Sequence, residues 1–245
     1  MKRRLLAFLL SFCFIQLIIG QTYTEAFESV TGGATAFTNN GVTFTLTSQQ
    51  SGPFDIQASY PGTGWNGTAA DNRYIDNDLY AVAGQGTQFT ITASASFRFN
   101  SAYFYLADNN ANNNVNGTLT IVGKLSGATK FTAVSTANFN NKTATNNGFT
   151  LIDMTTFGGS NNTTITIDQL VITTTTSFNY VSLDAFKFTK LTAPPTVSLS
   201  SQTNVACNGG STGAATVSAS GGTPSYSYSW APSGGTSASA TGLSA

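Results

Sequence analysis

The side chains that could perform acid–base or metal chemistry in this chain are almost all carboxylates. Ten Asp and Glu residues accompany ten Lys and Arg residues, and histidine is absent. Without histidine there is no Ser-His-Asp or Cys-His nucleophile and no site in which histidine holds zinc or iron. A glycosidase needs only two carboxylates, about 5 to 9.5 Å apart, but none stands in a setting that marks it as an acid or base. We therefore predict that the protein is not an enzyme.

The densest acidic group is formed by Asp71, Asp76 and Asp78. Together with two neighbouring Asn residues they could surround a cation, yet their spacing lacks the Gly and the terminal Glu of an EF-hand loop. We interpret the group as a solvated loop. Asp108, which precedes a run of Asn residues, is interpreted as a turn, because Asp and Asn tolerate left-handed backbone.

Two aromatic residues are candidates for ligand binding. Tyr60 and Trp65 lie in a segment rich in Gly and Pro, where a large ring is less often part of a core, and loops carry many of the residues that bind ligands. A ring of this kind can serve as a platform for a sugar. The alternative is structural, since a Trp can close one end of a sandwich with its indole N–H bonded to a backbone carbonyl.

These residues must be positioned by strands. Short runs of alternating apolar residues recur between turns rich in Gly and Asn, and no stretch after residue 20 holds a helical period. This spacing predicts an all-β protein with a sandwich or jelly roll. The expected strands cover residues 42–46, 89–92, 97–106, 118–122, 149–154, 164–172, 180–188, 196–199 and 226–230.

The chain begins like an exported protein. A basic start, Lys2 to Arg4, precedes an apolar run to Gly20, which is typical of a cleaved signal peptide. Removing residues 1–20 leaves seven basic residues against ten acidic ones, a net charge of −3. No basic cluster remains, so we expect neither nucleic-acid binding nor insertion into a membrane after cleavage.

The composition changes at a Pro-Pro pair, Pro194 and Pro195, which holds an extended backbone and suits a linker. We divide the chain into a signal peptide (1–20), a sandwich domain (21–192), a linker (193–196) and a second segment (197–245). Cys207 is the single cysteine after residue 20, so no disulfide within the chain is expected there.

The first domain resembles the jelly-roll sandwiches of carbohydrate-binding modules and galactose-binding-like domains. The resemblance rests on the Phe-Glu of segment 25–29, on strand 97–106 and on the closing segment 181–188. It implies a structural calcium ion where the first and last segments meet, with Glu28 and Asp184 as ligands. Carboxylates suit that role because Ca²⁺ takes oxygen ligands. Alternatively, both residues are exposed carboxylates at strand ends.

The second segment resembles the SprB-type repeat of Bacteroidetes surface adhesins. The resemblance rests on Cys-Asn-Gly-Gly from Cys207 and on Tyr-x-Tyr-x-Trp at Tyr226, Tyr228 and Trp230. The three rings fall on one face of a strand and are interpreted as core. The pattern stops before its last strand, so we expect an incomplete Ig-like β-sandwich repeat within a longer protein. The resemblance implies arrays exported by the type IX system.

Together these features predict a secreted or cell-surface adhesion protein. Its first domain would bind carbohydrate or another surface polymer, and the repeat would act as a spacer. The sequence leaves two alternatives open. The chain could be a purely structural stalk or matrix protein, or it could be the non-catalytic part of a larger secreted hydrolase.

Overall fold

The computed structural model describes residues 20–49, 53–57, 63–77, 86–108, 110, 112–139, 147–192, 195–222, 226–231 and 235–244. Gly20–Leu191 form one compact unit, and the residues from Thr192 onward belong to another. Nearly all the regular structure in these ranges is strand, with a short 3₁₀ turn, η2, at Phe157–Gly159. The predicted all-β class is confirmed. The predicted signal peptide lies outside the described residues, except for Gly20.

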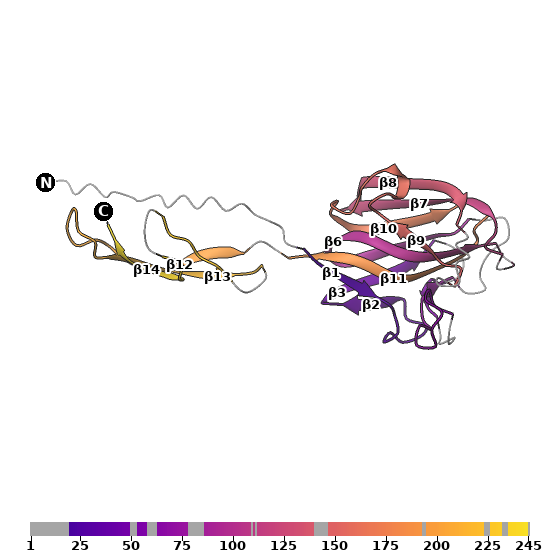
Figure 1. Cartoon of the computed structure of the whole chain (residues 1–245), viewed down its shortest axis with the longest axis horizontal. Coiled ribbons are helices and arrows are strands. Elements are labelled where there is room, and N and C mark those ends of the chain that lie inside the picture. The colour runs from indigo at the N-terminus through magenta and orange to yellow at the C-terminus, as the bar shows by residue number, and fades with distance from the viewer. Residues whose placement is uncertain are drawn as a thin grey trace. The chain divides into compact units, whose positions relative to one another are not determined.

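The first unit has two layers that share one long strand, β6 (Gln88–Ala107) (Figure 1). The first half of β6 lies between β3 and β10, and the second half lies between β11 and β9. Residues 93–96 separate the two halves and are small and exposed or half-buried. The two strands predicted at 89–92 and 97–106 are therefore one strand, which crosses from one layer to the other.

The strand pairs are antiparallel, and each layer has a simple order. The first layer consists of β2 (Ala36–Asn39), β3 (Val42–Ser48), the first half of β6, β10 (Ile167–Thr174), β7 (Asn116–Leu125) and β8 (Ala128–Asn138). The second consists of β4 (Asp55–Ile56), β5 (Ile75–Asp76), β11 (Tyr180–Leu191), the second half of β6 and β9 (Thr150–Asp153), with β1 (Gly20–Glu25) beside the end of β11.

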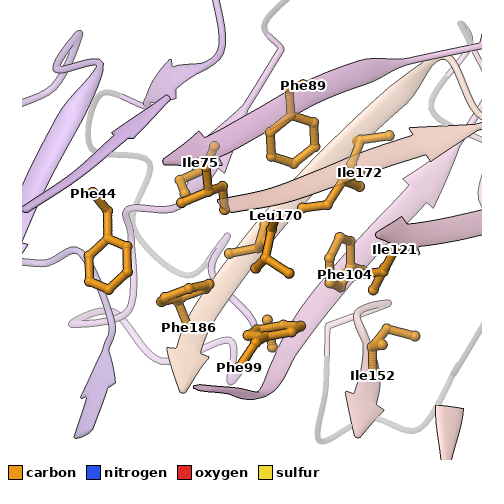
Figure 2. Close-up of a cluster of buried hydrophobic side chains, with 14 of the residues drawn as sticks. Phe44, Ile75, Phe89, Phe99, Phe104, Ile121, Ile152, Leu170, Ile172 and Phe186 are labelled. Carbon is orange, nitrogen blue, oxygen red and sulfur yellow. The ribbon is translucent and has the colours of Figure 1, made fainter. Parts of the chain in front are cut away.

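Phenylalanine side chains from both layers meet in the core between them (Figure 2). Phe44 of β3 is fully buried, and its ring centroid lies 5.2 Å from that of Phe186 and 4.8 Å from that of Phe188, both on β11. Phe99 stacks on Phe186 at 5.2 Å. Edge-to-face and offset contacts of this kind add to the free energy gained from burial. The alternating Phe residues of the sequence therefore join the two layers.

Hydroxyl groups pair across neighbouring strands on the outer surface. Thr38 and Thr43 lie 2.8 Å apart between β2 and β3, and Thr118 and Thr136 lie 2.7 Å apart between β7 and β8. Such cross-strand pairs stabilise a sheet by a few tenths of a kcal/mol to about 1 kcal/mol each. Much of the polar surface is therefore held together by uncharged groups.

The second unit has a sheet in the order β12 (Thr196–Thr203), β13 (Gly213–Ser220) and β14 (Ser239–Leu243). Trp230 is buried against Ala215, Val217 and Ala240, and its indole nitrogen donates to the Ser237 carbonyl at 2.8 Å. Residues 226–230 keep the predicted alternation of aromatic and exposed serine residues, but they do not form the predicted strand. The assignment of Trp230 to the core is correct.

Candidate functional site

A bulge in β11 creates the candidate site. Asp184 pairs with Tyr103 and Lys187 pairs with Ser101, so β11 carries one more residue than β6 over this stretch. The extra residue is Ala185, whose backbone is left-handed with φ of 47°. A bulge bends its strand and redirects the adjacent side chains. Here it leaves Asp184 and Tyr103 on the outer face of the second layer, while Phe186 turns into the core.

Asp184 anchors the segment of residues 63–73, which we call the platform loop. One carboxylate oxygen accepts a hydrogen bond from the backbone N–H of Ala185 at 2.6 Å, and the other accepts one from the backbone N–H of Trp65 at 3.1 Å. Asp184 has no exposed surface. A buried carboxylate is costly unless it is hydrogen-bonded. The donor from Trp65 is a backbone group, so it fixes the platform loop to β11 regardless of the side chain at position 65.

Two further carboxylates hold the same loop. Asp71, which is 4% exposed, accepts from the backbone N–H of Asn66 at 2.6 Å. Glu28 accepts from the backbone N–H groups of Asn72 and Arg73 at 2.9 and 3.1 Å. Gly64 is required here, because a Cβ atom at this position would lie 2.5 Å from Cγ of Asp71. Glu28, Asp71 and Asp184, which we call the acidic group, therefore all accept backbone N–H groups of the platform loop.

Burial dominates the electrostatics of the acidic group. Desolvation raises the pKa of Asp184 to about 8, with a further upward contribution from the charges of Asp71 and Glu28, although the N–H groups of Trp65 and Ala185 lower it. Desolvation also raises the pKa of Asp71, and the charge of Glu28 adds to that shift. The acidic group therefore favours anything that reduces its negative charge, either a proton or a cation.

The platform loop places Trp65 against Tyr103. The two rings are nearly parallel, at 17°, with centroids 4.1 Å apart, and both side chains are half-buried. Leu151 of β9 pairs with Tyr103 and is 43% exposed, one of the most exposed large apolar side chains in the described part of the chain. The side chain of Asn147 donates to the Gly64 carbonyl at 3.1 Å. An apolar strip, Trp65, Tyr103 and Leu151, therefore lies on the outer face beside exposed amides.

The structure corrects one interpretation of the acidic residues. Asp71 and Asp76 do not lie in a solvated loop. Asp76 is 1% exposed on β5 and accepts hydrogen bonds from Gln57 at 3.0 Å and from the Tyr180 hydroxyl at 2.9 Å. Their burial results from the packing of this segment on the second layer, which local composition does not reveal. Asp78 and Tyr60 lie outside the described residues.

Glu28 and Asp184 are not exposed strand-end carboxylates, because Asp184 is buried and Glu28 is half-buried. They accept hydrogen bonds from the same platform loop. The resemblance implied that they bind calcium together, and in the described part of the chain no three His, Cys, Asp or Glu side chains are grouped so as to hold a metal ion. Their oxygens accept backbone N–H groups instead. Sequence reasoning did not find Tyr103, which alternates within β6 like its structural neighbours.

The raised pKa of Asp184 gives a testable dependence of stability on pH. Between about pH 4 and pH 8 the folded protein holds a proton on Asp184 that the unfolded chain releases, so the free energy of unfolding is expected to fall as pH rises through this window. Urea unfolding in chelator at several pH values measures this. Asp184→Asn should flatten the dependence, whereas Asp168→Asn, which removes a charge on β10, should not. An unchanged slope in Asp184→Asn would contradict the assignment.

Comparison with known proteins connects the second unit to a family. Residues 199–236 match the family model of the SprB repeat, as the sequence resemblance predicted. A crystal structure of a DUF4465 family protein from Bacteroides caccae is similar at 12% identity, with a TM-score of 0.40, covering 69% of this chain and 98% of that one. Discoidin II from Dictyostelium discoideum is similar at 10% identity, with a TM-score of 0.35, covering 70% of this chain and 66% of that one. A search among curated proteins finds no match.

The repeat match indicates an extracellular or cell-surface protein. In the ranges that the structure describes, no helix has both the length and the apolar character needed to cross a membrane.

Proposed function

We propose that this chain is an exported surface protein whose first unit binds a glycan on the apolar strip and whose second unit is a spacer. The observation that carries the proposal is the stacked pair of Trp65 and Tyr103 on the outer face of the second layer. An aromatic face packs well against the C–H face of a sugar ring, and a few polar groups around an apolar surface orient the ligand. Asn66 and Asn147, both exposed, supply those polar groups.

The proposed ligand is an uncharged glycan. The acidic group accepts hydrogen bonds from the backbone of the platform loop, and the charges of Asp71 and Glu28 act repulsively on Asp184. Bringing a sulfate or uronate to this surface would add a further unfavourable interaction between like charges. Two basic residues lie close in sequence to the acidic group, Lys187 after Asp184 and Arg73 after Asp71. The backbone N–H of Arg73 donates to Glu28, and its guanidinium donates to the Val30 carbonyl.

A glycan array tests this function. The purified chain lacking residues 1–20 is expected to bind neutral oligosaccharides at least about tenfold better than sulfated or uronate-containing ones, which corresponds to about 1.4 kcal/mol of discrimination. Preferential binding of anionic glycans would contradict the ligand class. If the protein binds no glycan on the array, the binding function is contradicted and a structural stalk is favoured.

We also propose that calcium binds at Glu28 and Asp184, the two carboxylates that the jelly-roll resemblance implied as ligands. Their oxygen donors suit Ca²⁺, and a bound cation would offset the burial and the repulsion that raise the pKa of Asp184. The ion would supply charge neutralisation and hold the platform loop on β11.

Thermal unfolding at pH 9 measures the effect of calcium on stability. Millimolar Ca²⁺ is expected to raise the midpoint, because binding only to the folded state stabilises it. The increase should be lost in Asp184→Asn and kept in Asp168→Asn. A midpoint that does not respond to calcium would contradict this part of the proposal without affecting the glycan site.

A further inference from the structure

Strand β11 connects the candidate site to the second unit. It contains Asp184, which accepts the backbone N–H of Trp65, and it ends at Leu191, immediately before Thr192 begins the second unit. At about 3.4 Å per residue, the seven steps from Asp184 to Leu191 span about 24 Å. A ligand at Trp65 and the chain that leaves the sandwich are therefore connected along a single strand, β11.

Strand β11 is held on both sides over this distance. On one side it pairs with β6, from Tyr180 opposite Ala107 to Lys190 opposite Phe97. On the other side its final residues pair with β1, from Phe186 opposite Glu25 to Leu191 opposite Gly20. Two of its side chains, Phe186 and Phe188, are fully buried in the core. Sliding β11 along its axis would disrupt these contacts together.

The direction of pulling determines how these contacts break. The last residue of β6, Ala107, lies beside Tyr180, at the opposite end of β11 from Leu191. Tension between Ala107 and Leu191 acts along β6 and β11, so the hydrogen bonds between these two strands share the load. Gly20, by contrast, lies directly beside Leu191. Tension between Gly20 and Leu191 pulls β1 away from β11 one pair at a time.

We propose that the sandwich is a mechanically directional connector. Tension between the site end of β11 and the second unit loads β11 in shear. The sandwich resists this tension far better than tension applied at its own amino end, on β1. The source of the tension, a glycan held while the repeat is pulled, rests on the proposed function. The mechanical asymmetry itself rests only on the strand order and register.

Single-molecule pulling of the full chain tests the asymmetry without any ligand. In a Cys13→Ser, Cys207→Ser background, one variant carries handles at Asn110→Cys and Thr192→Cys, and the other at Gln21→Cys and Thr192→Cys. Asn110 is exposed just beyond the end of β6, and Gln21 is exposed on β1. Because forced unfolding is governed by the barrier along the pulling direction, the first pair is expected to give an unfolding force at least about twofold higher at the same loading rate.

Equal forces, or a lower force for the first pair, would overturn the proposal. The two variants must have the same urea midpoint. The difference in unfolding force then depends on the direction of pulling and not on a difference in stability. If either variant fails to fold, Asn112→Cys and Thr22→Cys provide the same two directions, since both residues are exposed and lie near the same strand ends. Because no ligand is present, failure here is separate from failure of glycan binding.

Discussion

Phe44→Ala is expected to lower the free energy of unfolding of the sandwich by about 3–5 kcal/mol, the usual cost of truncating a buried Phe. Phe44 is fully buried and lies within 5.2 Å, between ring centroids, of Phe97 on β6 and of Phe186 and Phe188 on β11. Its removal leaves a cavity where the two layers meet. Urea unfolding monitored by circular dichroism measures the loss.

The matched control for Phe44→Ala is Val134→Ala on β8, whose side chain is 47% exposed. Substitutions at exposed positions usually change stability by less than about 0.5 kcal/mol, so this variant should resemble the parent protein. A loss below about 1 kcal/mol in Phe44→Ala would mean that the layers do not depend on this contact.

Trp65→Ala is expected to weaken glycan binding by about 30-fold or more, equivalent to the roughly 2 kcal/mol typical of a central aromatic contact. The fold should persist, because Asp184 holds the platform loop through the backbone N–H of residue 65 and not through the ring. Trp65→Phe should retain part of the affinity, since a smaller ring can still stack on Tyr103. Titration with the best ligand from the array measures all three proteins.

Tyr226→Ala is the control for Trp65→Ala, because it removes a half-buried ring from the second unit. We expect no change in glycan affinity for that variant. If Trp65→Ala and Tyr226→Ala weaken binding equally, the site does not lie on the apolar strip. If Trp65→Ala leaves affinity unchanged while the protein stays folded, the proposed platform is wrong.

Alternation along the chain predicts strands well in this protein because one face of most strands is buried. Val42, Phe44 and Leu46 alternate with exposed or half-buried residues, and β3 lies where this pattern placed it. The pattern did not predict that β6 is continuous, because residues 93–96 lack an apolar face at the crossing between layers. It also missed β8, in which a single Phe, Phe131, lies among small and polar residues.

The site is less predictable because its residues are distant in sequence. Asp184 resembles an outward-facing residue in a strand, and it is buried only because the platform loop, some 119 residues earlier, covers it. The bulge lacks a sequence signal, since its left-handed residue is Ala185 and not glycine. Trp65 was a candidate because Gly and Pro surround it, whereas Tyr103 becomes one only through its contact with Trp65.

The hydroxyl pairs between strands have a consequence for where such a protein can work. Thr38 with Thr43, Thr118 with Thr136 and, in the second unit, Thr216 with Ser239 join neighbouring strands without net charge. Dissolved ions screen exposed charges within about 10 Å at 0.1 M salt and within about 3 Å at 1 M, but they leave neutral hydrogen bonds intact. The strand pairing at this surface should therefore be as stable in concentrated salt as in dilute salt.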